Sequence, residues 1–61
     1  MKELDVVRLK SNFKGLVAGT EGTIVLEYDG TAFEVEFFDR NGDTIDVLTT
    51  PVDIIELVSE Q

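Results

Sequence analysis

The side chains of this sequence that are capable of chemistry are nearly all carboxylates. Glu34 and Glu36 alternate along one short segment, and paired carboxylates of this kind serve general acid–base catalysis when they share an enclosed site. That work requires a pKa shifted by burial or by a close like charge. We expect these two residues on an open face instead, and the sequence has no histidine, cysteine or tryptophan. We therefore predict that the chain is not an enzyme and has no catalytic residues.

A second group of oxygen-bearing side chains resembles a calcium loop. It consists of Asp39, Asn41, Asp43 and Asp46. An EF-hand loop needs glycine at its sixth position and glutamate at its twelfth, whereas Gly42 is the fourth residue here. Asp and Asn are also ordinary turn residues. We predict no metal site and no cofactor, with a weak divalent-ion site as the alternative.

The charge of the chain limits its partners. Among 61 residues, thirteen are acidic and five are basic, which gives a net charge of −8. Such a chain is repelled by nucleic acid and by anionic membranes, since contacts with phosphates need Lys or Arg. The acidity indicates either a basic protein partner or simply a surface that keeps the protein soluble. Most of the basic residues lie early in the chain: Lys2, Arg8, Lys10 and Lys14, followed only by Arg40.

Length and composition also predict the setting in which the protein works. A chain of 61 residues has room for one domain, residues 1–61. No apolar run approaches the ~20 residues of a membrane-spanning helix. The first residues, Met1 to Asp5, include acids where a signal peptide has an apolar stretch. Together with the absence of cysteine, this favours a cytoplasmic protein without membrane contact.

Short β-branched and aromatic runs separated by glycine turns indicate an all-β fold. Five strands are expected: Leu4 to Lys10, Gly22 to Tyr28, Phe33 to Asp39, Thr44 to Thr50 and Ile54 to Val58. Pro51 ends the fourth strand because it lacks an N–H for the ladder. A single helical turn is expected at Pro51 to Asp53. The predicted fold class is a small five-stranded antiparallel SH3-like barrel.

Alternation in the third strand suggests a register for the central hairpins. A three-residue loop at Arg40 to Gly42 places Phe37 opposite Ile45 rather than opposite a carboxylate. A four-residue loop at 29–32 places Tyr28 opposite Phe33. The expected inner face then consists of Val7, Leu9, Ile24, Leu26, Tyr28, Phe33, Val35, Phe37, Ile45, Val47, Ile55 and Leu57.

The same register predicts an acidic outer surface. Glu27 lies opposite Glu34, and Glu36 lies opposite Asp46, which are unfavourable like-charge pairs. Three apolar residues, Val25, Phe38 and Leu48, are expected on that surface. We predict a partner-binding site made of Glu27, Glu34, Glu36, Phe38 and Asp46. In the alternative interpretation, Phe38 or Leu48 folds over the end of the barrel into a second small core.

Two segments resemble a known type of barrel. The segments 5–10, DVVRLK, and 19–25, GTEGTIV, look like the opening of an SH3-like barrel of the KOW type. The resemblance implies binding to RNA or to large assemblies through loops. The acidity of this chain departs from the RNA-binding members of that group.

A second resemblance extends along nearly the whole chain. The segments 1–7, 19–25, 33–37 and 44–49 are similar to a bacterial family known as the domain of unknown function four-nine-two-six. That family brings no catalytic or binding residues. Its members resemble small proteins of mobile gene neighbourhoods, which implies an antitoxin-like or immunity-like role.

Three functions follow from these observations. The first is a protein-binding module that presents an acidic outer sheet to a basic protein partner. The second is a KOW-like contact with RNA or the ribosome through Arg8, Lys10 and Lys14, although nucleic acid is an unlikely partner for so acidic a chain. The third is a structural homo-oligomer, in which Phe38, Val25 and Leu48 would be buried against their own copies. We expect a monomer or a weak homo-oligomer, since acidic faces repel their own copies.

Overall fold

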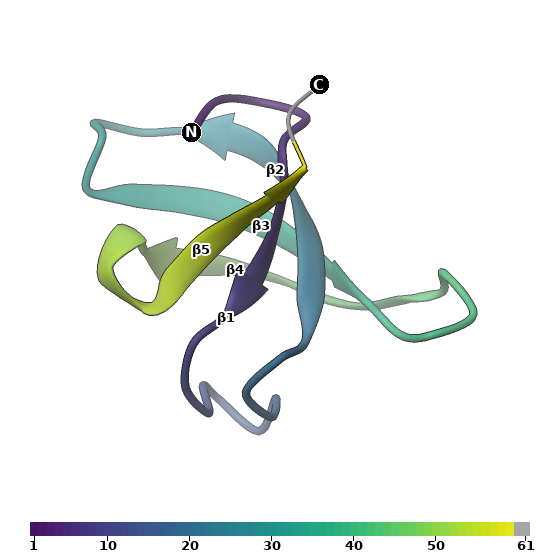
Figure 1. Ribbon diagram of the computed structural model, residues 1–61. Coiled ribbons are helices and arrows are strands. Elements are labelled where there is room, and N and C mark those ends of the chain that lie inside the picture. Colours follow the sequence, from purple (N-terminus) through teal and green to yellow (C-terminus); the bar gives the residue numbers. More distant parts are fainter. Residues whose placement is uncertain (60–61) are drawn as a thin grey trace.

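The glycine-bounded β-branched and aromatic runs form five antiparallel strands, and the computed structural model describes residues 1–59 (Figure 1). The elements in chain order are β1 (Val6–Leu9), β2 (Glu21–Glu27), β3 (Ala32–Phe38), β4 (Thr44–Pro51), the single 3₁₀ turn η1 (Val52–Ile54) and β5 (Ile55–Ser59). The predicted all-β class and the helical turn before the last strand are confirmed. The turn begins one residue later than expected. No helix in residues 1–59 is long and apolar enough to cross a bilayer.

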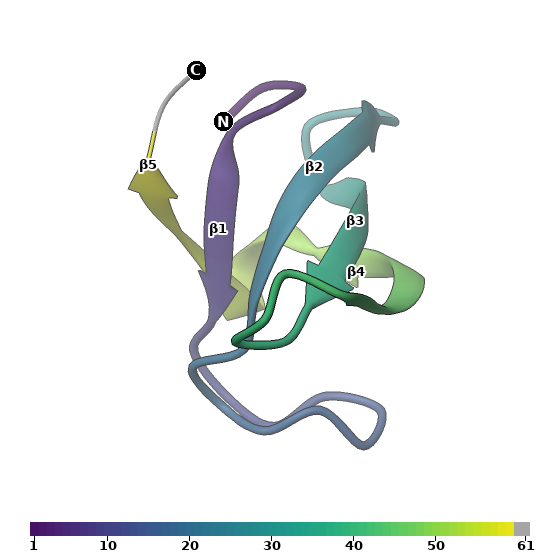
Figure 2. The same cartoon turned by 90° about the vertical axis from the view of Figure 1, so that its right-hand side faces the viewer.

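The five strands form one curled sheet in the order β4-β3-β2-β1-β5 (Figure 2). In a flat sheet, the first and last of five strands would lie about 19 Å apart. Yet β4 and β5 are joined only by the three residues of η1. From Pro51 to Ile55 the chain makes four Cα–Cα steps, which span at most about 14 Å. The sheet must therefore curl and bring its two edge strands toward each other, as in an SH3-like barrel.

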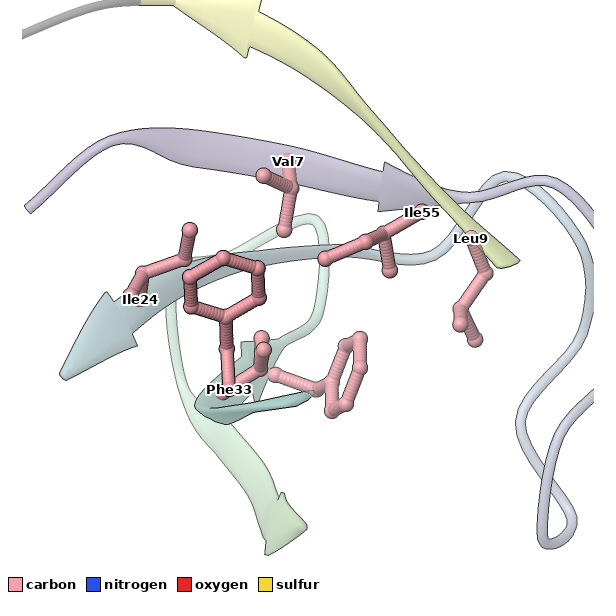
Figure 3. Close-up of a cluster of buried hydrophobic side chains, with 7 residues drawn as sticks. Val7, Leu9, Ile24, Phe33 and Ile55 are labelled. Carbon is pink, nitrogen blue, oxygen red and sulfur yellow. The ribbon is translucent and has the colours of Figure 1, made fainter. Parts of the chain in front are cut away.

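The hydrophobic core fills the inside of this curl. It is made of seven side chains that are at most 2% exposed: Val7, Leu9, Ile24, Phe33, Val35, Phe37 and Ile55. In Figure 3, side chains from β1, β2, β3 and β5 point into the same space. All seven were among the residues predicted to face inward. Alternation therefore predicts the centre of the core correctly.

A β-bulge in β2 changes the register of the first hairpin. Ile24 pairs with Val35, but Leu26 pairs with Glu34, so that Val25 is an extra residue. Beyond the bulge, Glu27 pairs with Phe33. The predicted four-residue loop is wrong, because the N–H of Tyr28 bonds to the carbonyl of Ala32 (3.3 Å), which leaves only residues 29–31 in the loop.

A second bulge changes the register between β3 and β4. The loop at Arg40 to Gly42 is confirmed, because the N–H of Asp39 bonds to the carbonyl of Asp43 (2.9 Å) and Gly42 has a φ of +85°. However, Phe38 pairs with Thr44 while Phe37 pairs with Asp46, so Ile45 is extra. The predicted pairing of Phe37 with Ile45 is therefore wrong. A bulge reverses the facing of every later residue.

These bulges remove several residues from the predicted inner face. They are Leu26 (44%), Tyr28 (53%), Ile45 (47%) and Val47 (47%). Leu57 (38%) is exposed for a different reason. Leu57 pairs with the buried Val7, but β5 is an edge strand and leaves it partly uncovered. In β4, Leu48 and Thr50 face inward instead, and Leu48 packs against the core. The outward position predicted for Leu48 is wrong.

Two glycines near the start of β2 have different reasons to be glycine. Gly19 has a φ of +93°, which L side chains rarely adopt. Gly22 is required by close packing, because a Cβ there would lie 2.6 Å from Cγ1 of Val35 and 2.9 Å from the carbonyl oxygen of Glu36. The backbone of β2 thus approaches β3 closely at Gly22.

Candidate functional site

The surface of β2, β3 and β4 that faces away from the core is built from three cross-strand rows. We call it the outer face, and each row has a residue of β3 at its centre. The rows are Leu26–Glu34–Thr49, Thr23–Glu36–Val47 and Glu21–Phe38–Thr44. Since residues paired across a ladder point to the same side, each row carries its three side chains on this face.

The carboxylate of Glu34 is held in place by hydroxyl groups on both sides. The hydroxyl of Tyr28 donates to Oε2 at 3.0 Å, and Oγ1 of Thr49 donates to Oε1 at 3.0 Å. Glu34 itself is half-buried. Each oxygen keeps acceptor capacity beyond these bonds. The carboxylate is therefore oriented and still able to accept a cationic donor.

Glu36 repeats this arrangement one row further along β3. Its Oε2 accepts a hydrogen bond from Oγ1 of Thr44 at 2.8 Å, and it too is half-buried. Its cross-strand neighbours, Thr23 and Val47, carry no charge. Two fixed carboxylates thus lie in successive rows of the same face.

Exposed apolar side chains surround these carboxylates. Leu26 and Val47 belong to the same rows and are 44% and 47% exposed. The bulge residues Val25 and Ile45 are 41% and 47% exposed. Phe38 in the third row is half-buried. A surface with apolar groups beside oriented carboxylates has the mixed chemistry of a protein-binding site.

Of the five residues predicted for this site, the structure brings together Glu34, Glu36 and Phe38. Glu27 lies opposite Phe33 and not opposite Glu34, because the bulge at Val25 shifts the register. The predicted like-charge pair between Glu27 and Glu34 is therefore wrong.

Asp46 is also separated from Glu36, which pairs with Val47 instead. Its position opposite Phe37 is tolerated because β4 is an edge strand and the carboxylate remains exposed. There, Oδ1 accepts the backbone N–H of Val47 at 2.8 Å. Asp46 thus covers a backbone donor on the strand edge.

The hydroxyl donors of the outer face were not predicted. Tyr28 was expected in the core, and Thr44 and Thr49 were treated only as strand residues. Polar and apolar residues alternate along β4 from Thr44, and this pattern could have indicated outward-facing threonines. However, the bulge at Ile45 decides which of the two alternating sets of β4 residues faces outward. An alternating pattern of apolar residues does not reveal where a β-bulge inserts an extra residue.

The basic residues near the chain start are occupied in other ways. Arg8 donates from Nε to Oε2 of Glu56 at 2.6 Å. Lys14 lies over the ring of Phe13, 5.4 Å from its centroid. Lys2 bonds through Nζ to the buried carboxylate of Asp5 at 3.1 Å. None of these three contacts lies on β2, β3 or β4, although Arg8 pairs across the ladder with Glu21.

Among the residues of the calcium-loop pattern, Asp39 stabilises the β3–β4 turn. Oδ1 of Asp39 accepts the N–H groups of Asn41 (2.9 Å) and Asp43 (3.0 Å). In the other hairpin, Oδ1 of Asp29 accepts hydrogen bonds from the N–H and from the hydroxyl of Thr31. The hydroxyl of Thr31 is the main reason that the pKa of Asp29 is lowered. Within residues 1–59, no group of three potential metal-binding side chains is present.

The curled five-stranded sheet and its 3₁₀ turn define a small all-β protein of the SH3-like class. Residues 3–58 match the family model described as "Domain of unknown function (DUF4926)". The match covers most of the chain, and the chain therefore belongs to this family. The search of curated proteins and the search of solved structures gave no match.

Proposed function

We propose that this protein is a protein-binding module whose outer face contacts a basic and partly apolar surface of another protein. Glu34 and Glu36 accept hydrogen bonds from lysine or arginine side chains of the partner. Leu26 and Val47, which flank them, supply the apolar contact area. An antitoxin-like or immunity-like protein would use such a face to cover a basic partner.

The observation that carries this proposal is the pair of half-buried carboxylates fixed by hydroxyl groups. Tyr28 and Thr49 orient Glu34, and Thr44 orients Glu36. A side chain that is already ordered loses less conformational entropy on binding. Charge-assisted bonds to a carboxylate are about twice as strong as neutral ones. The net charge of −8 adds long-range attraction for a cationic partner.

Contact with RNA has less support from the positions of the basic residues. Arg8 is already paired with Glu56 at 2.6 Å, so its guanidinium is partly neutralised. Of the other basic residues proposed to contact RNA, Lys10 and Lys14 remain as exposed cations. Two positive charges give little counterion release, on which non-specific affinity for nucleic acid depends.

The experiment is quantitative affinity capture from cells that carry the gene, with the wild type and the double variant Glu34→Gln/Glu36→Gln. Glutamine keeps the size of the side chain and removes the charge. We expect one salt-sensitive partner to bind the wild type and to be lost from the double variant. The partner is then purified for a direct titration with both proteins.

The matched control is Glu3→Gln/Asp53→Asn, which removes two exposed acidic charges away from the outer face. It has the same net charge as the double variant and should retain the partner. If the outer-face variant binds the partner as well as this control does, the proposed face is wrong.

A further inference from the structure

An open groove of about 660 Å³ lies at one end of the outer face. It is bounded by the end of the β1–β2 connection on one side and by the β3–β4 hairpin on the other, and Figure 2 shows both segments at the same end of the sheet. Its lining residues are 17–21 from the connection and the start of β2, 38–40 from the hairpin, and Ile45.

The groove has apolar surface within reach of a ligand. Phe38 is half-buried, and Val17 and Ile45 are 67% and 47% exposed. Burying such side chains against an incoming apolar group is favourable, at about 25 cal/mol per Å² of apolar surface. A groove of this size has room for an aliphatic or aromatic side chain together with part of the segment that carries it.

Hydrogen bonds fix both walls of the groove. In the connection, the N–H and Oγ1 of Thr20 donate to the carbonyl of Val17, and the N–H of Ala18 donates to Oδ1 of Asn12. In the hairpin, the N–H of Gly42 donates to the carbonyl of Asp39. The groove is therefore formed before a ligand arrives, which favours binding.

The charges of the groove favour a cationic neighbour beside the apolar group. Its lining carries Glu21, Asp39 and Arg40, which leaves an excess of one negative charge. Oδ1 of Asp39 is used by its turn. Glu21 is half-buried and pairs across the ladder with Phe38 on one side and with Arg8 on the other, and Arg8 is bound to Glu56 at 2.6 Å. Its carboxylate is thus placed to accept a cation close to Phe38.

The groove is continuous with the outer face, because Glu21 and Phe38 of the row Glu21–Phe38–Thr44 also line the groove. Oγ1 of Thr44 bonds to Glu36 in the preceding row. We infer that the groove binds an apolar side chain of an extended partner segment, while lysine or arginine residues next to it pair with Glu21 and Glu36. This inference rests on the proposed function and identifies the kind of segment the face would bind.

The test uses two synthetic hexapeptides with blocked ends, Gly-Lys-Phe-Lys-Gly-Ser and the same peptide with serine in place of phenylalanine. Each is titrated into ¹⁵N-labelled protein and followed by amide chemical shifts. We expect the phenylalanine peptide to shift the amides of Gly19, Phe38 and Ile45 and to bind about tenfold more tightly than the serine peptide.

Two double variants test whether the peptide binds in the groove or binds non-specifically to exposed apolar side chains. Val17→Ser/Ile45→Ser removes exposed apolar groups from the groove and should reduce the affinity for the phenylalanine peptide to that for the serine peptide. Leu4→Ser/Val58→Ser removes apolar groups of similar exposure (61% and 40%) outside the groove and should leave binding unchanged. The fold of each variant is checked by its amide spectrum.

The outcomes also separate this inference from the proposed function. Equal affinity for the two peptides, or no effect of the groove variant, overturns the groove as an apolar site. The proposed function stands in that case if Glu34→Gln/Glu36→Gln still abolishes capture of the partner. If the phenylalanine peptide binds the groove but capture is unaffected by that double variant, the groove stands and the role of the two glutamates fails.

Discussion

The two faces of β3 are made from alternate residues of one strand but are held by different interactions. Phe33, Val35 and Phe37 are at most 2% exposed and form the middle of the core. Glu34 and Glu36, between them, are half-buried and are fixed by hydroxyl groups from Tyr28 and from β4. The inner face is needed for folding. The outer face is organised at its polar groups.

The largest expected effect comes from the inner face. Phe37→Ala removes a fully buried ring at the centre of the core. Substitutions of this kind destabilise proteins by about 3–5 kcal/mol. A core of this size supplies roughly that much net stability. We expect the variant to be largely unfolded at 25 °C, as measured by circular dichroism and urea titration.

Ile45→Ala is the matched control, since it shortens an apolar side chain that is 47% exposed. It should shift the urea midpoint only slightly. A folded Phe37→Ala variant, or an equal loss in Ile45→Ala, would contradict the division of β3 and β4 into an inner and an outer face.

A smaller effect on stability is expected from the outer face. Thr49→Val keeps the shape of the side chain and removes the hydroxyl that donates to Oε1 of Glu34 at 3.0 Å. An exposed hydrogen bond contributes about 0.5–1.5 kcal/mol, so the variant should remain folded. Under the proposed function, it should nevertheless weaken capture of the partner, because Glu34 is then less well oriented.

Thr31→Val serves as the control for Thr49→Val, since it also removes one exposed hydroxyl bond but lies in a hairpin loop. Both variants are compared by urea titration and by partner titration. A loss of affinity that is the same in both would show that orientation of Glu34 is unimportant.

The sequence predicts the two faces of β3 well and the facing of β4 poorly. The alternation from Phe33 to Phe38 is regular, and burial of its apolar members leaves one solution. In β4, Ile45 and Val47 look like the inward set, yet the inward residues are Leu48 and Thr50. The bulge at Ile45 reverses which residues of β4 face inward, and nothing in the local sequence pattern indicates an extra residue there.

Two compensations make the unexpected register of β4 stable. The hydroxyl of Thr50, which is fully buried, donates to the carbonyl of Leu48 at 3.0 Å and so avoids an unsatisfied polar group. Asp46, opposite Phe37, turns to the backbone of Val47 at the open edge. Neither contact could be foreseen without the three-dimensional path of the strand. For the same reason, Glu34, Glu36 and Phe38 of the candidate site could be predicted, but not the hydroxyl groups that hold the carboxylates.

A third prediction concerns the edge of the outer face. The carboxylate of Asp46 occupies the N–H of Val47, and a charge at a strand edge opposes pairing with another chain. Asp46→Ala frees that donor beside the exposed side chains of Ile45 and Val47. We expect a small change in stability and a measurable shift toward dimer in sedimentation velocity at high protein concentration.

The control for Asp46→Ala is Asp43→Ala, which removes an exposed carboxylate next to the β3–β4 loop. It reduces the net charge by the same amount and should sediment as the wild type does. Dimer formation in both variants would assign the effect to general charge loss rather than to the strand edge.

The smallest expected effect is in the other hairpin and is seen as a pH dependence. The hydroxyl of Thr31 and then its N–H lower the pKa of Asp29 below the ordinary value of 3.8. A lowered folded-state pKa contributes stability that is present above the unfolded-state pKa and is lost as the pH falls through the folded-state value.

Thr31→Val removes the hydroxyl but keeps the N–H. The pKa of Asp29 should therefore rise part of the way toward 3.8, as measured by carboxyl ¹³C NMR titration. The control is Thr44→Val, which removes the hydroxyl that bonds to Glu36 and should leave the titration of Asp29 unchanged. An unchanged pKa in Thr31→Val would mean that the loop is ordered by its backbone alone, and that hydroxyl groups orient carboxylates only on the outer face.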